Sequence, residues 1–129
     1  ARWCERSGNL VKFPSYSILV RYNMFTINGI NWNLIFVNNS SPDLLRSDGT
    51  TSLAVTDWNS RSIFVSTAPK GAYLRRIIAH ELCHAFCFSY DISMPIEQEE
   101  YLAGWISLYG TDLVYLLDNI MSSLSRRAV

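Results

Sequence analysis

The segment at residues 80–84, with the sequence His-Glu-Leu-Cys-His, constrains this chain most because it places ionisable groups inside an apolar stretch. Residues 77–88 are otherwise apolar or small in almost every direction around a helix, so they predict a buried helix. Its ionisable side chains, apart from the thiols, are His80, Glu81 and His84. An unsatisfied buried polar side chain costs on the order of 1–3 kcal/mol. The fold must therefore supply partners for all three.

A metal ion would be such a partner. Residues four apart lie one above the other on a helix, so His80 and His84 can direct two imidazole nitrogens at one point, as Zn²⁺ requires at ~2.0–2.1 Å. Glu81 lies about a quarter-turn aside and can reach a metal-bound water without binding the metal, the position of a general base. The H-E-x-x-H pattern thus predicts a zinc hydrolase. The alternative is a pair of core histidines satisfied by the backbone or by each other.

A catalytic zinc usually has three protein ligands and one open position, so a third ligand must be found. In a metzincin the motif would continue with a glycine and a third histidine, but those positions hold Cys87 and Tyr90, which excludes that class. Cys87 could instead complete a closed, structural site. Buried free cysteines are, however, common as small apolar fillers.

Carboxylates that open a second apolar helix are the better candidates for the third ligand. They follow a turn-like segment at residues 90–95 and are Glu97, Glu99 and Glu100. A helix that doubles back here would bring its first turn near the histidines. We favour Glu100, which shares a stripe with small residues that permit close helix approach, and keep Glu99, on an equally apolar face, as the alternative. An acidic first turn also complements the helix dipole, which is the simpler role for at least one of the three.

Length and composition indicate one domain, residues 1–129, with its own core. The chain is 49% hydrophobic, and its 11 basic and 11 acidic residues give no net charge, which argues against nucleic-acid binding. We expect neither a membrane span nor a signal peptide. Cys83 and Cys87 are four apart on a helix, too far for a disulfide. Free thiols predict a cytoplasmic protein.

The first half of the chain predicts strands. Residues 28–29, Asn-Gly between apolar neighbours, are a strong hairpin signal because both positions need positive φ. Residues 30–37 alternate as a strand, and residues 52–58 and 62–66 predict a second hairpin. The remaining predictions are a loosely ordered N-terminal arm (1–13), a strand or short helix (15–25), and a loop (38–50) with a helical turn at 43–46.

The second half predicts two helices. The histidine helix is expected from about Pro69 to Phe88, capped by Ser66 or Thr67. The second is expected over residues 96–124, with a candidate break at Gly110 and a core-facing stripe of Leu102, Ile106, Tyr109, Leu113, Leu116, Leu117 and Ile120. Strands followed by helices indicate an α+β domain, a small antiparallel sheet of three or four strands packed on two helices.

The motif at residues 80–84, followed by Glu100-Tyr101-Leu102-Ala103 and preceded by the hairpin at 53–66, resembles the minimal zincin domain of the ImmA/IrrE-type metallopeptidases of phages and mobile elements. The resemblance covers about residues 50–110. It implies His80, His84 and Glu100 as zinc ligands and Glu81 as the base, as in a gluzincin. It also implies an edge strand beside the cleft, at residues 63–66, that pairs with extended substrate. Family members often carry a polar residue at the position of Gly104.

These observations together predict a cytoplasmic zinc metallopeptidase, in the host cell if the gene is phage-encoded. Its partner would be a protein or peptide substrate, with neither nucleic acid nor membrane. Two alternatives remain at this point: a non-catalytic interaction protein that zinc stabilises, and a metal-free binding domain with a residual histidine pair. The sequence selects neither the substrate, nor the group that stabilises the oxyanion, nor the oligomeric state.

Overall fold

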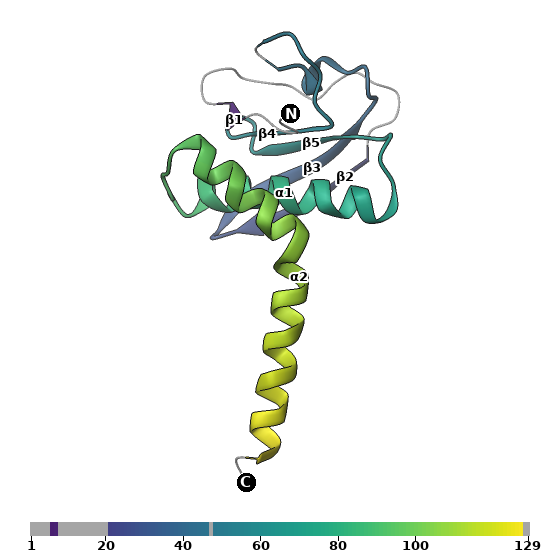
Figure 1. The fold of residues 1–129 in the computed structure, drawn as a ribbon. Coiled ribbons are helices and arrows are strands. Elements are labelled where there is room, and N and C mark those ends of the chain that lie inside the picture. The colour runs from purple at the N-terminus through teal and green to yellow at the C-terminus, as the bar shows by residue number, and fades with distance from the viewer. Residues whose placement is uncertain (1–5, 8–20, 47, 128–129) are drawn as a thin grey trace.

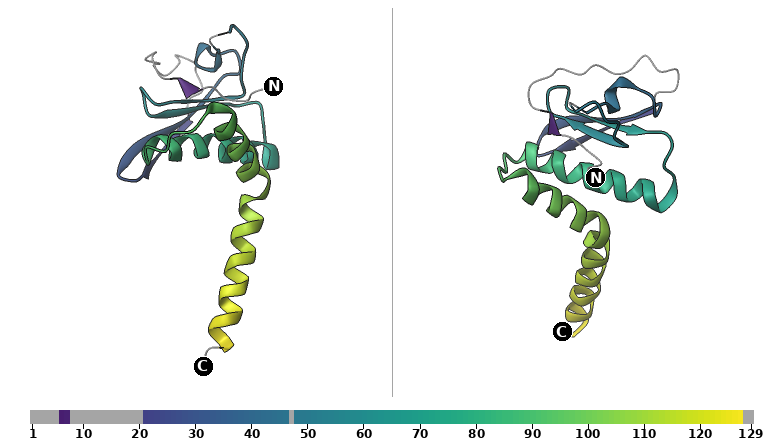
Figure 2. Two further views of the ribbon diagram at one scale, coloured as in Figure 1. Left: turned by 60° about the vertical axis from the view of Figure 1, so that its left-hand side comes forward. Right: turned by 45° about the horizontal axis from the view of Figure 1, so that its top comes forward.

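The computed structural model describes residues 6–7, 21–46 and 48–127, which form a mixed sheet followed by two helices (Figure 1). This confirms the predicted α+β class. In chain order the elements are β1 (Arg6–Ser7), β2 (Arg21–Ile27), β3 (Ile30–Val37), the 3-10 helix η1 (Pro42–Leu44), β4 (Ala54–Asp57), β5 (Ser62–Ser66), α1 (Gly71–Ser89) and α2 (Ile96–Arg127). In both figures α1 covers one face of the sheet, and α2 runs beside α1 before it projects from the body (Figures 1 and 2).

The first hairpin forms as predicted and also anchors the histidine helix. Asn28 and Gly29 have φ of 50° and 76°, and they place Ile27 opposite Ile30 in the β2–β3 pair. The Asn28 side-chain amide donates to the Ser89 carbonyl at 2.9 Å, at the C-terminal end of α1. The hairpin therefore holds the end of α1 from which the chain turns back.

The second hairpin also forms, with β4 and β5 antiparallel, but the sheet is not antiparallel throughout. Its order is β1-β4-β5-β3-β2, and the pairs β1/β4 and β3/β5 are parallel. The expectation that residues 63–66 form an edge strand is wrong, because β5 lies between β4 and β3. Every side chain of β5 is buried, which a central position requires.

The N-terminal predictions fall largely outside the described residues. Of the expected arm at 1–13, the structure describes Arg6–Ser7, whose backbone pairs with Thr56 and Asp57 of β4. Of the strand or helix expected at residues 15–25, the described part belongs to strand β2.

The histidine helix begins later than predicted and lacks the predicted cap. Lys70 occupies the N-cap position, where its side chain makes no capping hydrogen bond within the described chain, and Gly71 has φ of 58°. Ser66 is instead the last residue of β5, and its hydroxyl accepts a hydrogen bond from the Ala68 N–H at 3.1 Å. The apolar face of α1 packs on the sheet in a core of Ile27, Trp32, Ala54, Ile63, Val65, Ile77 and Ala85.

Helix α2 is one continuous helix through Gly110, so the candidate break is absent. Figure 2 shows that it bends as it leaves α1 and then extends into solvent. The predicted core stripe is wrong, since apart from the partly buried Ile106 its members are exposed: Leu102, Tyr109, Leu113, Leu116, Leu117 and Ile120. These apolar residues recur at helical spacing, but the described chain provides no second layer of structure to cover them. Neither described helix is long and apolar enough to cross a membrane.

Candidate metal centre

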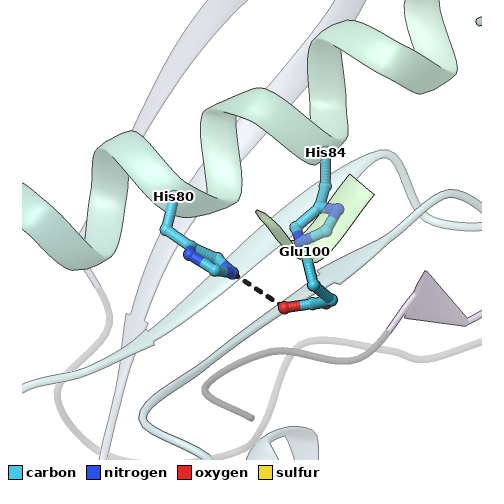
Figure 3. A group of neighbouring side chains, drawn as sticks. All are labelled: His80, His84 and Glu100. Atoms are coloured by element: carbon cyan, nitrogen blue, oxygen red, sulfur yellow. Dashed lines mark hydrogen bonds and ion pairs between the residues drawn. The ribbon is translucent and has the colours of Figure 1, made fainter. Parts of the chain in front are cut away.

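Helix α1 presents three buried ionisable side chains towards α2 and the sheet. His80, Glu81 and His84 are 6%, 0% and 1% exposed. The spacing of four residues brings the two imidazole rings together edge-on, with centroids 5.2 Å apart and planes at 63° (Figure 3). Both rings point to the same side of the helix, as the motif predicted.

A tight reversal after α1 brings the first turn of α2 against the histidines. Asp91 takes φ of 54°, and the Ile92 N–H donates to the Cys87 carbonyl at 2.8 Å, which closes the end of α1. The Glu99 N–H donates to the Pro95 carbonyl at 3.1 Å and starts α2. The acidic first turn of α2 therefore faces the C-terminal half of α1.

Glu100 lies between the two histidines. Its Oε2 is 3.2 Å from Nε2 of His80, and its Oε1 is 3.3 Å from Nε2 of His84. One ligand atom from each of these residues lies within 4.8 Å of the other two. Zinc bonds of ~2.0–2.2 Å in a tetrahedral site separate ligand atoms by about 3.4 Å. His80, His84 and Glu100 therefore form a candidate metal site of two nitrogens and one oxygen.

Glu99 contacts the other side of the His84 ring. Its Oε2 contacts Nδ1 of His84, the nitrogen that faces away from Glu100, and its side chain is fully buried. Glu97, by contrast, is exposed in the first turn of α2. The three glutamates thus occupy three different environments.

Glu81 is held by a residue that the sequence analysis did not single out. The hydroxyl of Thr56, on β4, donates to Oε1 of Glu81 at 2.6 Å. Both side chains are fully buried. The available signal was a polar residue within the apolar strand pattern of residues 52–58, but the sequence gives no reason to pair that residue with α1.

The carboxylates determine the charge of the site. Burial alone lowers the pKa of His84, but hydrogen bonds with Glu100 and Glu99 outweigh it and raise the pKa to about 9. Without a metal, this imidazole carries a proton at neutral pH. Carboxylates therefore contact both histidines, and the two rings also contact each other.

The cysteines contribute no ligand to the group. Cys83 and Cys87 are free and buried, as predicted, and they pack with Ala103. Burial and the neighbouring Cys87 raise the pKa of Cys83 to about 12, so it stays a neutral thiol. Among the described residues, the group of potential ligands that could hold a metal does not include Cys87.

The site reaches the surface at one point. Its most accessible member is Glu100, whose side chain retains 19% of its exposure, and the His80 side chain retains 7%. A metal bound here would thus be held by buried groups on one side and open towards Glu100. No family model matches the chain, and neither a curated protein nor a solved structure matches it.

Proposed function

We propose that this protein is a zinc-dependent peptidase. The observation that carries the proposal is the convergence of His80, His84 and Glu100 from two helices, with nearest ligand-atom distances of 3.2 and 3.3 Å. Two imidazoles and one carboxylate leave a fourth position for water, the composition of a catalytic rather than a structural zinc site.

In this proposal Glu100 binds the metal and Glu99 orients a ligand. A ligating histidine almost always donates its second N–H to a carboxylate or carbonyl, which fixes the ring and raises its basicity. The contact of Glu99 with Nδ1 of His84 supports that role, because Nε2 then faces Glu100. This division of roles favours Glu100 over Glu99 as the third ligand.

Bound zinc would lower the pKa of its water from 15.7 towards about 7 and polarise the scissile carbonyl. Glu81 would accept a proton from that water and pass it to the leaving amine. The hydrogen bond from Thr56 fixes one oxygen of the Glu81 carboxylate, so the side chain keeps one orientation through the cycle. The substrate would be a protein or peptide, and a cytoplasmic, phage-related setting is what the zincin resemblance implies.

Metal content and proteolysis together test the proposal. Protein purified without chelator should contain one zinc per chain by elemental analysis and should cleave reduced, unfolded casein. Glu81→Gln should keep the zinc and lose the cleavage, whereas His84→Ala should lose both. Glu97→Gln changes an exposed glutamate on the same turn as Glu100 and should behave like wild type.

Two outcomes would replace this function with another. Stoichiometric zinc with no cleavage of casein or of a peptide library would favour a zinc-stabilised interaction protein. Absence of zinc even after reconstitution would favour the metal-free alternative. That alternative has an observation behind it, since both histidines already contact carboxylates without a metal.

A further inference from the structure

The distal half of α2 leaves the body of the protein with its apolar side chains uncovered. Arg75 of α1 donates to the Thr111 hydroxyl at 2.8 Å, and from residue 112 to residue 127 the helix is exposed apart from the partly buried Ser123. Figures 1 and 2 show this part projecting into solvent. Its large apolar side chains, each 47–66% exposed, are Leu113, Val114, Tyr115, Leu116, Leu117, Ile120, Met121 and Leu124.

This segment is a poor helix former by itself. Residues 111–125 are rich in β-branched, aromatic, Asp, Asn and Ser residues, all of which have low helix propensity. Isolated helices of this length are marginal in water even with good sequences. Packing of the apolar face must therefore supply most of its stability.

The apolar side chains follow a heptad repeat along the helix. Successive members are alternately four and three residues apart: Ile106, Gly110, Leu113, Leu117, Ile120 and Leu124. Tyr109, Val114, Leu116 and Met121 flank this seam, and the opposite side carries Leu108, Asp112, Tyr115, Asp118, Asn119 and Ser122. A regular apolar seam, with most of the polar residues on the opposite side, is the pattern of a helix that packs lengthwise on another helix.

We propose that the seam pairs antiparallel with the same seam of a second copy of this chain. In an antiparallel pair, the seam residues of one helix face the seam residues of the other in reverse order. One register places every seam residue opposite a seam residue of the partner. Leu117 then faces the partner's Leu113, Gly110 faces the partner's Ile120, and Leu124 faces the partner's Ile106. Each contact occurs twice about a two-fold axis, as a closed dimer requires.

A hollow at Gly110 fits this register. A cavity of about 560 Å³ opens there, and its lining includes Arg75, Ala79, Trp105, Ile106 and Gly110. A Cβ at position 110 would approach Cγ2 of Ile106 to 3.2 Å, closer than an ordinary contact, so glycine fits this position best. The partner's Ile120 is a β-branched side chain of the size that such a hollow accepts.

The available area is enough for a stable dimer. Nine exposed side chains lie on or beside the seam: Leu102, Tyr109, Leu113, Val114, Leu116, Leu117, Ile120, Met121 and Leu124. If each buries on the order of 80 Å², about half of what a large side chain can bury, they supply roughly 720 Å² per protomer, within the range of a standard interface.

The charges favour a second copy over a membrane surface, and the antiparallel arrangement over the parallel one. Helices that lie on membranes carry Lys or Arg on the polar face, whereas here that face holds Asp112 and Asp118. The first turn of α2 is acidic at Glu97, and its last turn is basic at Arg126 and Arg127. Antiparallel pairing opposes the two helix dipoles and brings the basic last turn of each helix to within about two turns of the partner's acidic first turn.

Light scattering during gel filtration tests the proposal on the full chain. We expect about twice the chain mass at high micromolar concentration. Leu117→Glu should give the single-chain mass and weaken association at least 100-fold. Leu108→Glu is the matched control, since Leu108 is 49% exposed against 50% for Leu117 but lies on the opposite side of the helix, and it should stay dimeric.

Two further measurements make the result decisive. Circular dichroism and zinc content of Leu117→Glu should match those of wild type, which separates lost pairing from lost folding. Spin labels at Ser125→Cys, with Cys4→Ser, should lie about 30 Å apart, because Ser125 lies level with the partner's residue 105, 20 residues from the partner's own Ser125, and each residue rises 1.5 Å. A wild-type monomer, a Leu117→Glu dimer, or labels about 10 Å apart would overturn the proposal.

Discussion

Zinc affinity should rise steeply with pH, because a proton occupies His84 in the metal-free protein. Hydrogen bonds with Glu100 and Glu99 outweigh the effect of burial and hold the pKa of this imidazole at about 9. A histidine binds zinc only in its neutral form, so the proton must leave when the metal enters. Raising the pH removes this competition.

The size of the effect follows from that pKa. At pH 7, about two pH units below the pKa, the proton must be removed from His84 before zinc can bind. This cost weakens zinc binding roughly 100-fold, or by about 2.7 kcal/mol. The dissociation constant should therefore fall about tenfold per pH unit from 7 to 9 and level off above this range. Neutralising Glu99 removes one cause of the high pKa, so Glu99→Gln should show a shallower slope.

Competition against a chelator of known affinity, corrected for its own protonation, measures the slope. Calorimetry in buffers of different ionisation enthalpy counts the released protons, with about one expected from His84 at pH 7 and fewer as the pH approaches 9. Glu97→Gln should keep the full slope, because that side chain is exposed and outside the site. Equal zinc affinity at pH 7 and pH 9 would refute the reasoning.

Four further outcomes are expected. Metal-free protein should lose about 3 kcal/mol of stability as pH rises, because the folded pKa of His84, about 9, exceeds its unfolded value of 6.5. That stability is complete below pH 6.5 and lost through pH 9, which urea titrations at several pH values would measure. Glu100→Ala should abolish stoichiometric zinc, while Glu97→Ala retains it; equal loss would remove Glu100 from the site. Glu99→Gln should weaken zinc binding 10–100-fold at high pH, and an unchanged affinity would contradict its orienting role. Thr56→Val should destabilise the fold by about 1–3 kcal/mol through its lost bond to a buried carboxylate, and Thr56→Ser should restore most of it.

Much of the local structure could be predicted because it depends on neighbours in the chain. The Asn28-Gly29 turn needs positive φ at two successive positions, and few other residue pairs permit that. The helical spacing of His80 and His84 directs both rings to one side, whatever the rest of the fold does. The start of α1 escaped prediction because Ser66 is used by the sheet and Gly71 begins the helix.

Long-range pairing could not be predicted, because pattern alone does not say which strands meet. The hairpin of β4 and β5 was visible in the sequence, yet the parallel pairing of β5 with β3 puts residues 63–66 in the centre of the sheet. The hydrogen bond between Thr56 and Glu81 joins residues 25 positions apart in the chain, and it forms because α1 packs on the sheet. The stripe on distal α2 had the period of a core face, but a period does not identify what covers it.

The sequence by itself determined the chemistry available at the site: two imidazoles at helical spacing, a carboxylate beside them, and acidic residues after a turn. Only the tertiary structure decided where those glutamates lie. Glu100 is between the Nε2 atoms of the two histidines, and Glu99 contacts Nδ1 of His84. Adjacent residues on a helix differ by about 100° in direction, so a rotation of α2 by that angle about its own axis would exchange their positions. That rotation is set by packing across the helix interface.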